Sequence, residues 1–446
     1  MRFKATSLAF LGFLACSGLV GALAPARAAP SEYAAGTRPI SQEEYRQDFD
    51  FLVEQLEARH PDPFAVTSKA AFVARLNALI DKVDEQDSFT NMMDLRVIVA
   101  SLGDSHTSVG FYDAIFERGA FPMEFAWFGE DLRIIGAEKE FSEFLGARLD
   151  AINAHDIKTV RDQLATLVPP QDTGFARKRV PWMMRHIGLH HYIGTAKGSS
   201  AVWTMTTLSG QQVTVTIPAS VLGDEEADLN YLSDQIDHPT WINSNEDRLD
   251  VMFRDILFPD GVYLVHYNSA CGRELQERFR DPTTAKNYPL FSEFSDRIIR
   301  TLKDKDVKAM IFDVRANSGG SSPQGTRLAE EIAALPDENQ PGSIYVAVGD
   351  QTFSAAIINA MNFNQTLGAQ FIGTTSGGKA NHFGEVRMFV LPNSGIELPH
   401  STRYFEYVEG EGGSIVPDIY SPESIDDMLA GRDAVVESVR KQVAQR

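Results

Sequence analysis

Short apolar runs alternate with longer amphipathic segments in the second half of the chain. Four of the runs have the length and composition of buried strands, at 262–265, 309–314, 344–348 and 370–372. Segments with helical spacing lie between or after them, at 291–302, 324–334 and 354–367. Alternation of strand and helix is typical of βαβ units and a largely parallel sheet. The predicted fold class is therefore α/β.

The first half of the chain has a different pattern. A capping box at 41–44 opens a helical repeat of apolar residues that stops at Pro61 and Pro63, and a second amphipathic segment runs from 69 to 83. Apolar runs at 125–128 and 132–135 are separated by a Gly-Glu-Asp turn and predict two paired strands. We expect a helical region followed by a module that contains β-strands.

Three features between residues 313 and 379 carry chemistry. Ser354 lies where a predicted strand gives way to a helix, Gly319 and Gly320 form a turn after another strand, and Lys379 follows a third strand. Acyl transfer needs a nucleophile, a base and N–H donors for the oxyanion. Each feature alone has a simpler explanation, since Ser354 could be a helix N-cap, the glycines a tight turn, and Lys379 a solvated loop residue.

The order and spacing of these features resemble the tail-specific, or C-terminal processing, serine protease family. Residues 313–320 fit its motif Asp-x-Arg-x-Asn-x-Gly-Gly, and the separation of Ser354 from Lys379 (379 − 354 = 25) equals that of its Ser-Lys dyad. The resemblance implies a crotonase/ClpP-like βαβ protease core with Ser354 as nucleophile and Lys379 as base. It also implies Gly319 and Ala355 as oxyanion donors. We expect structural roles for Asp313, which ends a buried strand and could accept from loop amides, and for Arg315, which could pair with a carboxylate or a substrate terminus.

The same family has a tricorn-like branch that uses a Ser-His-Ser-Glu tetrad. Residues 102–107 resemble the Asp-x-His-Thr motif of many family members, and the Ser-His pair within them resembles the tricorn-like branch. Residues 413–419 resemble the closing motif of the family. His106 is thereby an alternative base, with Ser105 and Glu411 as further candidates of the tetrad; Glu385 and Glu409 are other acidic candidates. The chain departs from the dyad pattern at Phe383, where a glutamine usually orients the lysine. The sequence therefore leaves both mechanisms open.

Residues 145–153, followed by a helical segment, resemble the second half of a PDZ domain, although the Gly-Leu-Gly-Phe loop that binds carboxylates is not visible. A β-sandwich-like spacer is the alternative. The expected organisation is a signal peptide at 1–28, an N-terminal helical region at 29–115, a PDZ-like module at 116–222 and a catalytic core at 223–446.

The N-terminus predicts export. Arg2 and Lys4 precede an apolar run that ends at Ala26-Arg27-Ala28, which is an A-x-A cleavage pattern. We expect a cleaved signal, a periplasmic or secreted protein, and no membrane span in the mature chain. Lipoprotein anchoring at Cys16 is a weaker alternative, because the residues before it fit that signal poorly.

The chain carries 61 acidic and 41 basic residues, a formal net charge of −20. This balance disfavours nucleic acid and anionic membranes as partners. We expect no cofactor and no metal, and the oligomeric state is left open. The predicted function is a serine endopeptidase that cuts unstructured or C-terminal protein segments through an acyl-enzyme. The alternative is a non-catalytic relative that binds apolar ligands or peptides.

Overall fold

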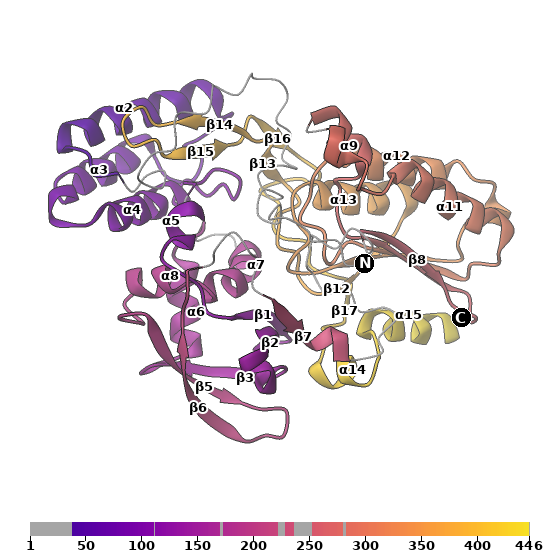
Figure 1. Cartoon of the computed structure of the whole chain (residues 1–446). Coiled ribbons are helices and arrows are strands. Elements are labelled where there is room, and N and C mark those ends of the chain that lie inside the picture. Colours follow the sequence, from indigo (N-terminus) through magenta and orange to yellow (C-terminus); the bar gives the residue numbers. More distant parts are fainter. Residues whose placement is uncertain are drawn as a thin grey trace. The chain divides into compact units, whose positions relative to one another are not determined.

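A computed structural model describes residues 38–110, 112–169, 173–221, 228–235, 252–279 and 282–445. The expected signal peptide and Cys16 lie outside these residues. The chain divides into two compact units, each of which is described by itself (Figure 1). The Ser354 unit comprises the described residues of Ile236–His382 and Glu406–Arg446, and the His106 unit comprises those of Ala22–Gln235 and Phe383–Phe405. The fold is mixed α/β, as the sequence predicts.

The Ser354 unit is built on a six-stranded sheet in the order β17-β12-β11-β10-β9-β8. The pairs from β17 to β9 are parallel, and β8 is antiparallel to β9. Its strands are β8 (Phe253–Leu257), β9 (Val262–Tyr267), β10 (Ala309–Asp313), β11 (Ile344–Val348), β12 (Gln370–Gly373) and β17 (Ile419–Tyr420). Its helices are α9 (Arg273–Phe279), α10 (Pro282–Ala285), α11 (Phe291–Asp304), α12 (Ser322–Ala333), η4 (Asp337–Asn339), α13 (Ala355–Leu367), α14 (Ile425–Leu429) and α15 (Ala434–Ala444).

The apolar side chains of this sheet form two hydrophobic clusters, because successive residues of a strand point to opposite faces. Met310 and Phe312 belong to the cluster that contains residues of α11, α12 and α13. Ala309 and Ile311 belong to the cluster that contains Val435 and other residues of α15. Helices therefore cover both faces of the sheet, which explains why its central strands are continuous apolar runs.

The His106 unit combines helices with a seven-stranded sheet in which β1-β2-β3-β5-β6 form one path and β4 and β7 pair with β3 and β2. Its helices are α2 (Gln42–Arg59), α3 (Lys69–Ile80), η1 (Val83–Glu85), α4 (Ser88–Ala100), α5 (Tyr112–Phe116), η2 (Lys139–Phe144), α6 (Ile157–Ala165), α7 (Thr173–Met184), α8 (Ile187–Tyr192) and η3 (Leu232–Gln235). Its sheet strands are β1 (Met123–Phe128), β2 (Asp131–Glu138), β3 (Arg148–Ile152), β4 (His155–Asp156), β5 (Ser200–Thr206), β6 (Gln212–Pro218) and β7 (Leu229–Tyr231).

A late segment of the chain returns to this unit. Strands β14 (Arg387–Val390) and β15 (Glu397–His400) form an antiparallel hairpin, and β16 (Arg403–Phe405) pairs with β13 (His382–Gly384). The fully buried carboxylate of Asp48 on α2 accepts hydrogen bonds from the N–H groups of Asn393 and Ser394 at 2.8 and 2.9 Å. The hairpin is thus fixed to the first helix of the unit.

The local predictions hold for these elements. The capping box at Ser41 and Glu44 is formed, the strands expected near 125 and 132 pair as β1 and β2, and the helix expected near 160 is α6. Within the described ranges, no helix combines the length and the hydropathy that a membrane crossing needs.

Candidate active site

Ser354 is the N-cap of α13 and has an unusual backbone conformation. Its φ is 53° and its ψ is −122°, and its side chain makes no capping hydrogen bond. For a residue other than glycine, this backbone conformation raises the free energy of the folded state by about 1–3 kcal/mol, and such residues cluster at active sites. Ser354 is therefore an N-cap by position, but it lacks the side-chain hydrogen bond of an ordinary N-cap. The next residue, Ala355, is at the first position of α13, where an N–H has no acceptor within the helix.

The glycine turn lies directly against this serine. Gly319 has a φ of +117°, and a Cβ added to it would lie 2.8 Å from the Cβ of Ser354 and 3.3 Å from the Ala355 nitrogen. No other residue type fits there without a shift of the backbone. The Gly319 N–H donates to Asn317 Oδ1 at 2.8 Å. The turn and the helix N-terminus thus meet at the serine, and one of the two predicted oxyanion donors is engaged by a side chain.

Hydrogen bonds connect the loops that bring these groups together. Asn317 Nδ2 donates to the carbonyl of Tyr267 at the end of β9 at 2.8 Å, and the Phe353 N–H donates to the Asn317 carbonyl at 3.1 Å. Thr352 Oγ1 donates to the carbonyl of Val314 at 2.8 Å. The carboxyl ends of three neighbouring strands are therefore joined just below Ser354. This is the edge where ligands bind in parallel α/β sheets.

Lys379 lies in the same unit as Ser354. The Gly378 N–H donates to the Thr352 carbonyl at 3.0 Å, and a Cβ on Gly378 would lie 3.1 Å from the ring of Phe353. The residue before the lysine, Gly378, thus contacts the segment that leads into Ser354. Within the described part of the chain, no hydrogen bond joins the Lys379 ammonium to Ser354 Oγ, and Lys379 is half-buried.

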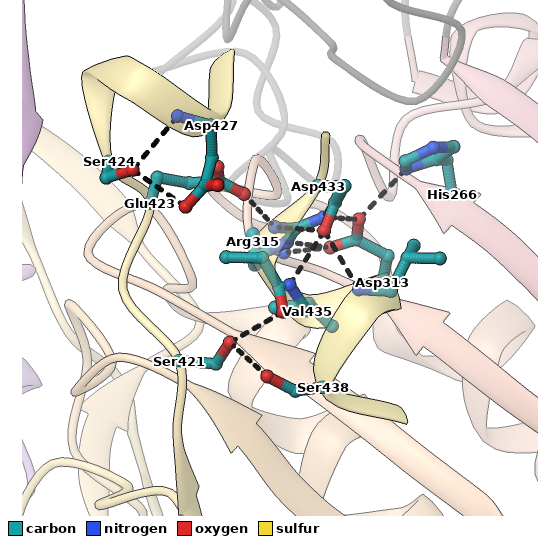
Figure 2. A network of polar contacts seen from close by, with 12 residues as sticks. His266, Asp313, Arg315, Ser421, Glu423, Ser424, Asp427, Asp433, Val435 and Ser438 are labelled. Carbon is teal, nitrogen blue, oxygen red and sulfur yellow. Dashed lines mark hydrogen bonds and ion pairs between the residues drawn. The ribbon is translucent and has the colours of Figure 1, made fainter. Parts of the chain in front are cut away.

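A network of buried charges anchors the motif strand (Figure 2). The Arg315 guanidinium donates to Asp313 and Asp433 at 2.7 Å each and to Glu423 at 2.7 Å. His266 Nδ1 lies 3.0 Å from Asp313 Oδ2. Asp433 also caps α15. The structural roles expected for Asp313 and Arg315 are confirmed, since they connect the end of β10 to the C-terminal segment.

The charge balance of this network shifts the pKa values of its carboxyl groups. Burial and the neighbouring Asp433 charge raise the pKa of Glu423 to about 8, against the opposing effect of Arg315. Burial acts in the same direction on Asp313, but Arg315 and His266 outweigh it and hold the pKa of Asp313 well below its ordinary value. The guanidinium therefore outweighs burial at Asp313 but does not outweigh it at Glu423.

The His106 unit contains a second polar centre around the carboxylate of Asp104. Asp104 Oδ2 accepts from Ser401 Oγ at 2.6 Å, from Thr107 Oγ1 at 2.5 Å and from His60 Nε2 at 3.1 Å. His60 Nδ1 accepts from the N–H of Asp62, so Nε2 carries the proton that it donates to Asp104. Burial raises the pKa of Asp104, but these donors and the histidines lower it well below its ordinary value.

His106 is held beside this carboxylate. Its backbone N–H donates to Asp104 Oδ1 at 2.9 Å, and its ring Nδ1 lies 4.0 Å from the same oxygen. The side chain is 7% exposed. Burial lowers the pKa of His106, while the Asp104 charge and the Phe383 backbone oppose that shift. The imidazole is therefore neutral at neutral pH, the form that a general base requires.

The remaining candidates are less enclosed. Ser105 is half-buried in the His106 unit, and Glu411 and Glu409 are exposed in the Ser354 unit. Glu385 is exposed in the His106 unit, has a φ of 56° and lies 3.9 Å from Arg403. The structure thus brings Gly319, Ala355 and Ser354 together, with Lys379 nearby, and groups Ser105 with His106. In the described ranges, no cluster of histidine, cysteine and acidic side chains could hold a metal ion.

The sequence indicated the Asp104 centre only in part. Its local motif pointed to His106, but His60 lies 44 positions before Asp104 and Ser401 lies 297 positions after it. The Asp-x-His-Thr motif could have predicted that Asp104 is buried and therefore accepts hydrogen bonds from other side chains.

Comparisons with known proteins show what fold this chain has. No protein-family model matches it, and no curated protein matches it either. Mature CPAF complexed with lactacystin is similar over 90% of this chain and 98% of its own, with a TM-score of 0.63 and 14% identity. Another structure of mature CPAF is similar over 90% and 96%, with a TM-score of 0.59 and 13% identity.

The photosystem II D1 C-terminal processing protease also matches, over 88% of this chain and 98% of its own, with 13% identity; its TM-score of 0.38 is too low to support an argument. At these identities the likeness establishes the fold and nothing finer. The chain has the fold of mature CPAF.

Proposed function

We propose that the protein is a serine endopeptidase that hydrolyses peptide bonds in unstructured or C-terminal protein segments. The observation that carries the proposal is the conformation of Ser354, at φ 53° against the Gly319 turn and the N-terminus of α13. A hydroxyl that makes no capping hydrogen bond and stands beside the first N–H of a helix can attack a carbonyl and leave its oxygen facing that donor. The fold shared with mature CPAF, co-crystallised with lactacystin, supports a ligand-binding site in it.

The reaction would proceed through an acyl-enzyme. Ser354 Oγ would attack the scissile carbonyl as the base takes its proton, the base would return that proton to the leaving amine, and water would then release the acyl group. Ala355 N–H is one proposed oxyanion donor. Gly319 N–H is the other, and its use requires that the hydrogen bond to Asn317 Oδ1 be given up.

Two residues remain candidates for the base. Lys379 has the matched spacing from Ser354, and the N–H of its neighbour Gly378 donates to the Thr352 carbonyl. His106 is a buried neutral imidazole placed by Asp104, and Ser105 and Glu411 would complete a tetrad with it. We retain Lys379 as the first choice because its position relative to the nucleophile in the sequence fits the family's dyad.

The proposal includes the setting of the enzyme. We propose that the chain is exported and processed after Ala28, that its Ser354 unit is a crotonase/ClpP-like core, and that its antiparallel sheet with α6 is a PDZ-like module. The proposed substrate is a protein or peptide. N-terminal sequencing of the exported protein tests the processing, and an intact Met1 in a membrane fraction contradicts a cleaved signal.

Labelling with a fluorophosphonate probe tests the nucleophile. The wild type should be labelled and should degrade an unfolded protein, and Ser354→Ala should abolish both. Ser68→Ala is the matched control, because Ser68 caps α3 through a hydrogen bond from the Ala71 N–H. That change should cost about 1 kcal/mol of stability and leave labelling intact. If the wild type is neither labelled nor active but binds apolar ligands, the non-catalytic alternative is correct.

A further inference from the structure

A cavity of about 320 Å³ lies in the Ser354 unit beside α9, α11 and α12. Its lining includes Leu275 of α9, Phe291 of α11, and Ser321, Gln324 and Leu328 at and beyond the start of α12. The three helices lie near one another in the Ser354 unit (Figure 1). Nothing in the proposed chemistry uses this cavity.

Two of the helices that line the cavity, α9 and α12, begin at the same edge of the sheet as the nucleophile. Helix α9 follows β9 and α12 follows β10, whereas Ser354 follows β11, the next strand in the sheet. Neighbouring strands are about 4.8 Å apart, so the loops after β9 and β10 lie roughly 5 to 10 Å from the loop that holds Ser354. Ser321 is also only two residues beyond Gly319, whose Cβ position touches the serine. The cavity is therefore within reach of a substrate held at Ser354.

The chemistry of the cavity favours an apolar occupant. Leu328 is fully buried, Phe291 is 6% exposed, and Leu275 is half-buried. Two of the lining carboxylates already have donors: Glu274 accepts from the N–H groups of Phe291 and Ser292 at 3.0 and 2.9 Å, and Glu331 accepts from Ser295 Oγ at 2.9 Å. The other charged lining residues, Arg278, Asp296 and Arg327, carry both signs. No single sign of charge dominates, so the lining does not select a charged side chain.

The geometry points to this cavity as a specificity subsite that takes a large apolar side chain, such as that of leucine or phenylalanine, from the peptide substrate. This inference rests on the proposed peptidase function of Ser354. An extended peptide advances about 3.4 Å per residue. A side chain two or three residues from the scissile bond would therefore reach a cavity that lies one or two strands away.

Binding to the Ser354→Ala protein tests the subsite without any turnover. Decapeptides of alanine, glycine and serine that carry one phenylalanine at successive positions would be compared with the same peptide without it. A phenylalanine in the cavity should tighten the dissociation constant about tenfold or more. Equal affinities at every position, or no binding of any peptide, would overturn the inference.

Leu275→Trp should fill the cavity and remove that preference, and Leu275→Ala should enlarge it and favour bulkier side chains. Leu367→Trp, at a half-buried leucine in the last turn of α13 and outside the cavity, is the matched control and should keep the wild-type preference. A Leu275→Trp protein that still prefers the phenylalanine peptide as the control does contradicts the subsite. A Leu275→Trp protein whose affinity for every peptide falls by the same factor also contradicts it.

The cleavage profile separates this inference from the proposed function. Active protein should cut the phenylalanine peptide about tenfold faster in kcat/KM than the alanine peptide. Cleavage of both peptides at equal rates contradicts the proposed subsite but agrees with the proposed peptidase function. Selective binding of the phenylalanine peptide without labelling or cleavage contradicts the proposed peptidase function but agrees with an apolar binding site.

Discussion

The Ser354 centre and the Asp104 centre organise polar groups in opposite ways. At Ser354 the backbone is strained, the hydroxyl makes no capping hydrogen bond, and the neighbouring glycine turn packs so closely that Gly319 has no room for a Cβ. At Asp104 a buried carboxylate collects hydrogen bonds from His60, Thr107 and Ser401. The first arrangement raises the energy of the fold locally, and the second lowers it.

This contrast separates a centre whose groups are available to a substrate from a centre whose groups stabilise the fold. A group can act on a substrate only if its hydrogen-bonding capacity is not fully used within the protein, and Ser354 with the Ala355 N–H meets that condition. Asp104 does not, because its oxygens are occupied. It can act only through the residues that it holds, above all His106.

The largest expected effect concerns the base, because it decides whether the Asp104 centre takes part in catalysis at all. We expect Lys379→Ala to lower kcat/KM by about 10² to 10⁴, the usual contribution of a general base, and His106→Ala to cost less. Lys303→Ala, an exposed lysine in the last turn of α11, is the control and should be neutral.

The measurement is kcat/KM for each variant across pH. The ranking inverts if His106 is the base, and the acid limb of the wild-type profile then falls at a pH below about 6.5, because burial lowers the pKa of His106. A Lys379→Ala enzyme with most of its activity excludes the dyad.

The second expected effect is the stability of the Asp104 centre. Asp104→Ala removes the acceptor of the His60 and Ser401 donors and leaves them buried without a partner of equal strength. We expect a loss of about 3 kcal/mol or more in the free energy of unfolding, measured in urea. Asp84→Ala, at an exposed position of η1, should change stability by less than about 0.5 kcal/mol. A loss below about 1 kcal/mol for Asp104→Ala would show that the centre is not a stabilising one.

How far the sequence predicted the two centres depends on the range of the interactions. The strands and helices around Ser354 follow from local patterns, because continuous apolar runs mark the buried strands and the glycine turn marks the chain reversal. The positive φ of Ser354 could not be predicted, since serine rarely adopts it and only the packing of Phe353 and Gly319 around it imposes it.

The hydrogen-bond partners of Asp104 and Arg315 could not be predicted from the sequence for a different reason. Ser401 reaches Asp104 because a late segment of the chain returns to the His106 unit. Asp433 reaches Arg315 across 118 positions because α15 packs on the sheet. Buried charges reveal that they need partners, but only the tertiary fold decides which distant residues supply them.

A third, smaller effect distinguishes the His106 unit by its response to acid. His186 is 1% exposed and packs against Phe116 and Trp182, at ring distances of 5.4 and 4.3 Å. Burial, with the charges of Arg185, His190 and Arg179, holds the pKa of His186 well below its ordinary value. The unfolded chain therefore binds a proton near pH 6.5 that the folded chain does not.

Stability contributed by neutral His186 is thus present above about pH 6.5 and is lost as the pH falls below it, by about 1.4 kcal/mol per pH unit. His186→Phe, which keeps an aromatic ring, should make the protein about 2 kcal/mol less sensitive to a change from pH 6.5 to pH 5. Urea denaturation of both proteins at the two pH values measures this, and equal pH dependence contradicts the burial of a neutral imidazole.

The smallest effect tests the strain at Ser354 itself. Ser354→Gly should relieve the positive φ, and although glycine has the greater entropy in the unfolded chain, we expect a net gain of about 1 kcal/mol in the free energy of unfolding. Ser354→Ala is the matched variant, since it keeps the Cβ and therefore the strain. Both changes remove the hydroxyl, so activity does not distinguish them, whereas the difference in their urea midpoints reports the backbone alone. If the glycine variant is no more stable than the alanine variant, the serine conformation costs nothing, and the contrast with the Asp104 centre must rest on hydrogen bonding without strain.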